Sequence, residues 1–338
     1  MSATIVPEKK NHYPVLLKEV LNIISPQDGG TYIDCTFGQG GYTKKILEFP
    51  GTRVIAFDRD LDSKIVAEKF KKKYRNRFEF YHKKFSEIDS IKLPKKIKGI
   101  IFDLGFSNIQ IKDQKKGLSF KHIGKLNMKM GHNNFSADDV VNKLSSQDLE
   151  QIFKFFGEEE QSKKISKIII NHRKAKNVKT EDLVKIINYS KKNFTKKNKA
   201  TKVFQALRML VNNEISELII GLSKSSNLIS KNGIIVTVTF HSIEDRICKF
   251  FFNKISSSEK VSRYMPLNKP KNISFSMTNK KPIIPSLKEI ENNPPSRSAK
   301  LRGVKRNDIK KIDTNFLLEK FKNLLKIEKL SLKLWKIS

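Results

Sequence analysis

The chain of 338 residues contains only two cysteines, Cys35 and Cys248. Two thiols so far apart are too few for a disulfide framework or a zinc cluster, so we expect no bound metal and a reducing cytoplasm. The sequence also lacks any apolar run of about eighteen residues, the length that spans a bilayer, and its N-terminus lacks the apolar segment of a signal peptide. We therefore predict a soluble, cytoplasmic protein with no membrane partner.

Arginine is scarce, with 11 residues among 68 basic side chains. The formal net charge of +34 favours a nucleic-acid partner, because basic side chains release counterions from phosphates. The excess of lysine, isoleucine and asparagine is also typical of an AT-rich genome, so charge alone favours nucleic acid only modestly over a well-solvated surface. The arginines that fall within motifs are Arg59, Arg208, Arg246, Arg297 and Arg302.

Strands and helices alternate along the first hundred residues. Residues 31–37 are apolar and β-prone, glycines follow them, and residues 42–49 have a helical pattern. The other predicted strands are 53–57, 78–81, 99–104 and 233–240. This alternation predicts an α/β fold, with a parallel sheet covered by helices on both faces.

The rhythm changes after residue 107, and residues 136–199 show only helical periodicity. The candidate N-caps are Ser136, Ser146 and Thr180. A single long helix is predicted over residues 200–230. The chain therefore divides into a first part of the core at 1–107, an inserted helical domain at 108–200, a second part of the core with a basic loop at 201–307, and an amphipathic helical tail at 308–338.

The first predicted strand ends in the sequence DCTFGQGG, with Gly38, Gly40 and Gly41. Such glycines let the backbone approach a ligand at the carboxyl edge of a parallel sheet, although tight turns use glycine anyway. Asp58 ends the next strand, where a carboxylate can accept both ribose hydroxyls of an adenosine. NAD and S-adenosylmethionine both present this ribose. NAD binding needs three spaced glycines, the last of which packs the helix on the strand, whereas here the third glycine is followed by Tyr42 and no second phosphate-binding feature appears, so we favour S-adenosylmethionine.

Asp103 ends the fourth predicted strand, at the edge where a methyl donor and its acceptor meet, and can orient either an acceptor amine or the amino group of the donor. After the fifth strand we expect Ser242 to cap a helix and His241 to contact a target base. A Ser-His hydrolase is excluded because no glycine elbow presents the serine. Residues 294–306, with Arg297 and Arg302, form a basic loop that suits phosphate oxygens or solvent equally well.

The order of these motifs resembles the ribosomal RNA small subunit methyltransferase H family. The resemblance is collinear from His12 to about Arg306 and covers nearly the whole chain. The segments that carry it are HYPVLLKE (12–19), YIDCTFGQGG (32–41), DRD (58–60), DLGFS (103–107) with Gln110, GLSF (117–120), FQALR (204–208) with Asn212 and Glu214, FHSIEDR (240–246) and SRSAKLR (296–302).

The resemblance implies a class I S-adenosylmethionine-dependent methyltransferase, with a Rossmann-like sheet and an inserted helical domain. It also implies N4 methylation of a cytidine in the decoding region of 16S ribosomal RNA, either free or in the small ribosomal subunit. The donor-binding residues that it implies are Gly38, Gly40, Gly41, Tyr42, Asp58, Phe85, Asp103 and Gln110. The substrate-binding candidates are Phe106, Phe120, Arg208, His241, Arg297 and Arg302. We expect the target base to leave its stack and enter a pocket where Asp103 orients its amine.

The chain departs from the family pattern at Tyr42, Asn108, Asn127 and Lys129, where the family usually has His, Ser, Asp and Arg. An amide and an ammonium at positions 127 and 129 weaken any ion pair there, so we expect no proton-transfer role for that segment. The alternatives are a methyltransferase of the same fold with another acceptor and a non-catalytic RNA-binding or assembly protein. An NAD-dependent dehydrogenase is a more distant third.

Overall fold

The computed structural model describes residues 14–106, 110–111, 113–120, 124–131, 133–191, 198–257 and 273–336. Within these residues seven strands form one sheet in the order β3-β2-β1-β4-β5-β7-β6. They are β1 (Gly30–Asp34), β2 (Thr52–Phe57), β3 (Phe78–Tyr81), β4 (Ile97–Asp103), β5 (Ile234–Thr239), β6 (Phe275–Met277) and β7 (Lys300–Arg306). Strands β1 to β5 are parallel, as predicted, and β6 and β7 close the sheet as an antiparallel pair.

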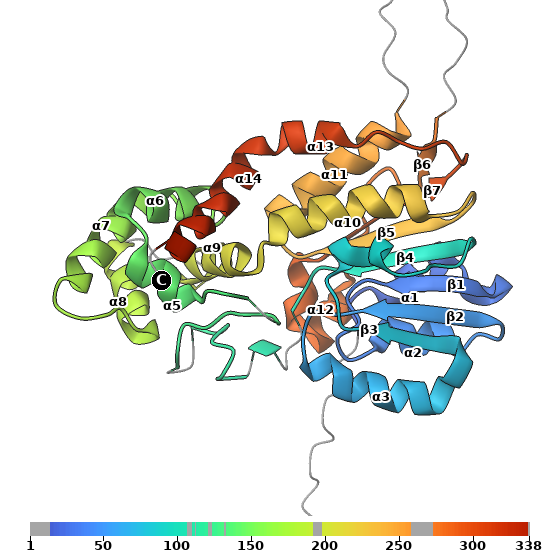
Figure 1. Cartoon of the computed structure of the whole chain (residues 1–338), viewed down its shortest axis with the longest axis horizontal. Coiled ribbons are helices and arrows are strands. Elements are labelled where there is room, and N and C mark those ends of the chain that lie inside the picture. The colour runs from blue at the N-terminus through green and yellow to red at the C-terminus, as the bar shows by residue number, and fades with distance from the viewer. Residues whose placement is uncertain are drawn as a thin grey trace, which may run out of the picture.

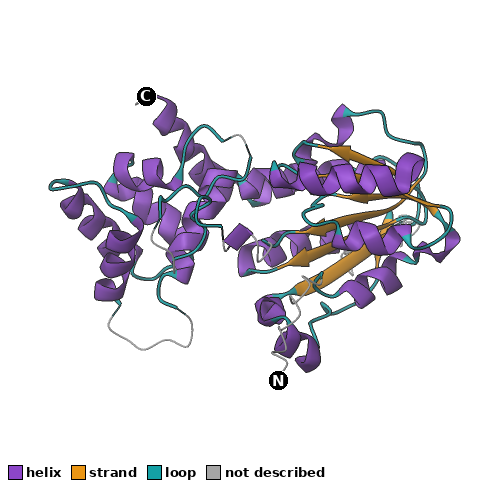
Figure 2. Ribbon diagram, turned by 90° about the horizontal axis from the view of Figure 1, so that it is seen from below, coloured by secondary structure: helices purple, strands orange, loops and turns teal. Residues whose placement is uncertain are grey.

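Helices cover both faces of the sheet, as the strand pattern predicted (Figure 2). The alternation of side chains along β4 shows this, because Ile101 packs in one buried cluster while Ile100 and Phe102 pack in the other. The first cluster includes side chains from α1 (Leu17–Ile24), α2 (Gly41–Leu47) and α3 (Asp62–Tyr74). The second includes side chains from α10 (Glu214–Leu228) and α11 (Ser242–Ser256).

The helical lobe lies beside the sheet (Figure 1). It contains α5 (Ala137–Lys143), α6 (Ser146–Phe155), α7 (Ser162–Arg173) and α8 (Thr180–Ser190). The predicted cap Ser136 is confirmed, since its side chain accepts a hydrogen bond from the Asp139 backbone at 3.2 Å. The other two predicted caps are each one residue too late, because Ser145 caps α6 and Lys179 precedes α8.

The prediction of one helix over residues 200–230 is wrong. Helix α9 (Thr201–Asn212) ends and α10 begins at Asn213, whose φ of 50° lies in the left-handed region. Asparagine tolerates this conformation better than most residues, and it breaks the helical hydrogen-bond ladder. Helix α9 packs against α5 and α6, whereas α10 covers the sheet, so Asn213 lies at the junction between the two lobes.

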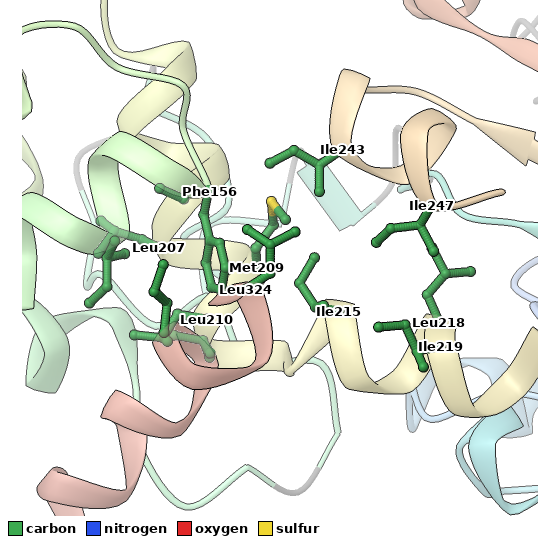
Figure 3. Packing of buried hydrophobic residues seen from close by; sticks show 14 of the residues in the cluster. Phe156, Leu207, Met209, Leu210, Ile215, Leu218, Ile219, Ile243, Ile247 and Leu324 are labelled. Carbon is green, nitrogen blue, oxygen red and sulfur yellow. The ribbon is translucent and has the colours of Figure 1, made fainter. Parts of the chain in front are cut away.

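The tail is helical, as predicted, but it forms short segments rather than one helix, and these dock on the body of the protein. These are α13 (Asn315–Lys320), α14 (Lys322–Glu328) and the 3-10 segment η5 (Lys329–Lys336). Leu324 of α14 lies among Phe156, Leu207 and Leu210 of the helical lobe (Figure 3). Among the residues that the structure describes, no helix has the length and apolar character to cross a membrane.

The remaining elements are short and lie mostly at the ends of strands. They are η1 (Pro26–Asp28), η2 (Arg75–Arg77), η3 (Phe85–Ser90), α12 (Leu287–Asn292) and η4 (Pro294–Ser298). Two of them matter for the pocket described next, because Phe85 opens η3 and Pro295 lies in η4.

Candidate active site

A pocket opens at the carboxyl edge of the parallel strands. Its walls come from the segments that follow β1 and β2, from the end of β4, from the residue after β5, and from the first turns of α10. This edge is where open parallel sheets bind ligands. The predicted residues that line the pocket are Gly38, Gly41, Tyr42, Asp58, Phe85, Asp103, Phe106 and Gln110.

The glycine turn after β1 is held against the end of β2 by Asp58. One carboxylate oxygen accepts the Gly38 N–H at 2.6 Å, and the other accepts the Asp60 N–H at 2.8 Å. Gly38 has a φ of 51° and Gly40 a φ of 72°, both in the left-handed region. Gly40 itself does not line the pocket, although its two neighbours in the chain do. Burial raises the pKa of Asp58 against the effect of these hydrogen bonds. The Ser63 side chain also hydrogen-bonds to this carboxylate, so about one of its four lone-pair sites remains for a ligand hydroxyl.

Gln110 lines the pocket and is hydrogen-bonded to a second acid, Asp60. Its Nε2 donates to Asp60 Oδ2 at 2.6 Å, and Lys116 pairs with the same oxygen. Burial alone would raise the pKa of Asp60, but the hydrogen bonds from Lys116 and Gln110 lower it. No local sequence pattern marks Lys116, because its partner lies 56 positions earlier in the chain.

Asp103 has a buried oxygen, Oδ1, with no hydrogen-bond partner among the described residues. Its backbone N–H donates to Thr36 Oγ1 at 2.8 Å, which fixes the end of β4 beside β1. Burial, together with the negative charge of Asp34, raises the pKa of Asp103 to about 7. A buried acceptor without a partner is costly, so this wall of the pocket is suited to a ligand that donates a hydrogen bond.

Arg208 contacts two residues that line the pocket near the start of α10, Glu214 and Phe106. Its guanidinium pairs with Glu214 in a bidentate arrangement, at 2.9 Å from Nε to Oε1 and 3.0 Å from Nη2 to Oε2. The same guanidinium lies 4.1 Å from the centroid of the Phe106 ring, a cation-π distance. Phe106 and Glu214 line the pocket, so Arg208 positions both of them although it is not itself part of the lining.

His241, rather than the predicted Ser242, is the N-cap of α11. Its imidazole Nε2 lies 3.0 Å from a carboxylate oxygen of Glu244. Of these two residues, Glu244 lines the pocket and His241 does not. Burial would raise the pKa of Glu244, but the adjacent His241 lowers it. Donor atoms of Glu214, His241 and Glu244 lie within 4.8 Å of one another. Arg208 already pairs with both carboxylate oxygens of Glu214, so a metal ion bound there would share that carboxylate with a second cation.

Of the six predicted substrate residues only Phe106 lines the pocket; Phe120, Arg297 and Arg302 lie outside the lining, as Arg208 and His241 do. The loop predicted at 294–306 is wrong from residue 300 onward, because those residues form β7. Arg302 is only 7% exposed and donates from Nε to Asp245 at 2.7 Å, so it is a buried ion-pair partner and not a phosphate ligand. Phe120 packs edge-on against Phe204 at 5.7 Å. Arg297 is exposed in η4, two residues from the lining residue Pro295.

Two further polar residues, Glu217 and Arg59, build this site without a role predicted from the sequence. Glu217 lines the pocket and accepts the Ser86 N–H at 2.9 Å. Arg59 binds the backbone carbonyls of Met130 and Asn212 at 2.8 and 2.7 Å. The spacing of Glu214 and Glu217 on one helix face was the available signal for Glu217. Of the departures from the family pattern, Asn127 donates to the Lys115 carbonyl at 3.2 Å, and Asn108 lies outside the described residues.

The fold and the site together define a class I methyltransferase: an α/β sheet with a glycine turn after β1, an acid after β2 and an acid at the end of β4, all at one pocket. Residues 9–307 match the model of the MraW methylase family. The chain belongs to this family.

Individual relatives agree with this assignment. The ribosomal RNA small subunit methyltransferase H of Ehrlichia canis (strain Jake) is 41% identical over 300 residues, with 87% of this chain and 99% of that protein covered. The protein of the same name from Orientia tsutsugamushi (strain Ikeda) is 40% identical over 306 residues, with 86% and 96% covered.

Two solved structures are similar to this chain at much lower sequence identity. An rRNA methylase from Streptococcus thermophilus has a TM-score of 0.37 at 9% identity, with 90% of this chain and 100% of that chain covered. The N-methyltransferase NodS from Bradyrhizobium japonicum, in complex with S-adenosyl-L-homocysteine, has a TM-score of 0.38 at 6% identity, with 90% and 94% covered. At these scores the likeness carries no further argument.

Proposed function

We propose that this chain transfers a methyl group from S-adenosylmethionine to the N4 amine of a cytidine in the decoding region of 16S ribosomal RNA. The observation that carries the proposal is the buried, unpartnered Oδ1 of Asp103 in the wall of the pocket. The N4 amine of cytosine is a hydrogen-bond donor, and carboxylates are its usual protein acceptors. The choice of ribosomal RNA as the substrate rests on the names of the curated relatives.

The residues at the β1 and β2 end of the pocket fit the donor. Asp58 has a lone pair left for a ribose hydroxyl, and the space that a Cβ on Gly38 would enter holds only the Thr36 carbonyl, at 3.9 Å. Tyr42 and Phe85 supply apolar walls. When bound, S-adenosylmethionine supplies an electrophilic methyl carbon. The chain contributes binding and alignment, which are the main requirements of an in-line displacement.

The residues at the α10 end fit a base. Phe106, supported by Arg208, offers an aromatic face for stacking, and Glu214 and Glu244 add acceptors beside it. In the proposed reaction the Asp103 carboxylate accepts a hydrogen bond from the acceptor amine and so directs the nitrogen lone pair toward the donor end. The amine proton then leaves to water after transfer. Exposed lysines on the helical lobe, such as Lys163, Lys167 and Lys174, suit RNA phosphates.

The direct test is transfer of tritiated methyl from S-adenosylmethionine to small ribosomal subunits that lack this modification, followed by nucleoside analysis. Label in N4-methylcytidine supports the proposal. Label in another nucleoside or in protein rejects the acceptor while the methyltransferase assignment stands. Donor binding without any transfer would favour a non-catalytic RNA-binding protein.

Substituting Gly38 with valine is expected to weaken donor binding by at least about tenfold, because the new side chain projects into the pocket from a left-handed residue. Gly51→Val is the matched control. Gly51 has a φ of 71°, its added Cβ would meet only Gly29 Cα at 3.7 Å, and it lies outside the pocket lining. Both variants should lose about 1–2 kcal/mol of stability from backbone strain. Isothermal titration with S-adenosylhomocysteine checks the difference, and equal affinities would contradict it.

The raised pKa of Asp103, about 7, predicts how activity depends on pH. If the carboxylate is the active form, kcat/KM for the donor falls as pH drops below 7, approaching about tenfold per pH unit, since this parameter reports the free enzyme. Burial also raises the pKa of Asp34, to about 6, so a second group titrates nearby. The Asp103→Asn variant distinguishes Asp103 from Asp34, because its pH profile should lose the decrease in kcat/KM that begins near pH 7. A profile that the substitution leaves unchanged would remove Asp103 from this role.

A further inference from the structure

Helix α10 lacks a cap from its own N-terminal residue. Asn213 precedes the helix in the left-handed conformation, and its side chain makes no capping hydrogen bond. The acceptor comes instead from the tail, more than a hundred residues later in the chain. Glu328 accepts the Ile215 N–H through Oε1 at 2.9 Å and the Ser216 N–H through Oε2 at 3.1 Å. These are backbone donors that an N-cap side chain normally satisfies.

The surroundings of Glu328 commit its carboxyl group to this contact. The residue is only 5% exposed, and burial raises its pKa to about 7 against the hydrogen bonds from Ser216 and Ile215. A carboxylate at a helix N-terminus is also favoured by the helix dipole. Removing it would leave two buried or half-buried amides without an acceptor, an arrangement that proteins avoid.

The tail on either side of Glu328 contacts both lobes of the protein, and these contacts hold Glu328 in place. On the sheet side, Phe321 packs against Phe250 of α11 with ring centroids 5.6 Å apart. On the helical side, Lys333 pairs with Asp148 of α6 at 2.7 Å, and Leu324 lies among the side chains of α9 and α6 (Figure 3). The tail therefore crosses the junction at which α9 ends and α10 begins.

The capped amides lie directly beside pocket residues. Glu214, the first residue of α10, lines the pocket and pairs with Arg208, and Asn212, two residues before it, also lines the pocket. The conformation of this short segment sets where both side chains point. Glu328 touches neither the pocket nor any reacting atom, so an effect on catalysis would pass through α10.

We propose that Glu328 is a positioning residue for methyl transfer, which caps α10 from the tail and thereby holds Glu214 at the substrate end of the pocket. The inference rests on the proposed function. It assigns a role to a segment outside the family match, which ends at residue 307.

The test compares Glu328→Ala and Glu328→Gln with Glu319→Ala in the full-length chain. Alanine removes both acceptor oxygens, glutamine keeps one of them and the side-chain volume, and Glu319 is an exposed acid of α13. Hydrogen exchange of the Ile215 and Ser216 amides, measured without substrate, should be about tenfold faster in Glu328→Ala, less so in Glu328→Gln, and unchanged in Glu319→Ala. The same order should appear in kcat for RNA methylation, with donor affinity within about twofold of wild type.

Unchanged exchange in Glu328→Ala would overturn the proposal. So would faster exchange with kcat unchanged, or an equal loss of kcat and donor affinity, since the last indicates general destabilisation. Hydrogen exchange does not depend on the substrate. If the wild-type chain failed to methylate RNA, the proposed function would fall and the positioning role with it, while the exchange data would still decide whether Glu328 caps α10.

Discussion

Asp103→Asn is expected to lower kcat for methyl transfer by at least about a hundredfold, a usual range for the loss of a group that handles the reacting proton or charge. The amide keeps the shape of the carboxyl group but carries no charge and presents NH₂ where an amine must donate. Because the carboxyl is buried with a raised pKa, its removal should cost little stability. Single-turnover methylation with saturating donor measures the effect.

The matched control for this variant is Glu291→Gln, which makes the same change in charge at an exposed residue of α12. It should retain wild-type kcat. A kcat for Asp103→Asn within about threefold of wild type would show that the buried carboxylate is not the group that orients the acceptor amine.

Asn212→Ala should lower the free energy of unfolding by about 3 kcal/mol, because several buried polar groups lose their partners together. The Asn212 amide donates to the carbonyls of Met128 and Arg208 at 2.8 and 2.9 Å. Its carbonyl oxygen accepts from the Met130 N–H and from the Asn133 side chain, both at 2.9 Å. Urea unfolding measures the loss.

Asn292→Ala is the control for this prediction, since Asn292 is exposed and should stay within about 0.5 kcal/mol of wild type. Met130 lines the pocket, so the Asn212→Ala variant should also lose RNA methylation beyond what its lower stability explains. An unfolding free energy close to wild type would mean that water replaces the asparagine without cost.

The sheet and the donor end of the pocket follow from local patterns and one topological rule. Apolar runs bounded by glycine or acid mark β1, β2 and β4, and parallel strands bring their carboxyl ends to one edge. Gly38, Asp58 and Asp103 could therefore be placed together from the sequence before any contact was known. Their joint presence in the pocket lining confirms that placement, while their proposed roles await the experiments above.

Other features of the fold and the site depend on contacts between residues far apart in the sequence, which no local pattern encodes. The break at Asn213 interrupts a continuous helical periodicity, because the packing of α9 on the helical lobe and of α10 on the sheet outweighs local propensity. Arg302 looked like a loop arginine, yet its partner Asp245 lies 57 positions earlier and draws it into a strand. The cap that Glu328 provides is equally non-local.

The pairing of β4 with β5 also orders the events of folding. Ile100 of β4 pairs with Ile235 of β5, and the helical lobe lies between them in the chain. During synthesis the edge of β4 stays open until β5 emerges, whereas the helices of the insertion can form from nearby contacts. An exposed strand edge invites aggregation, so the interval between these two strands is the stage at which the nascent chain most needs chaperone protection.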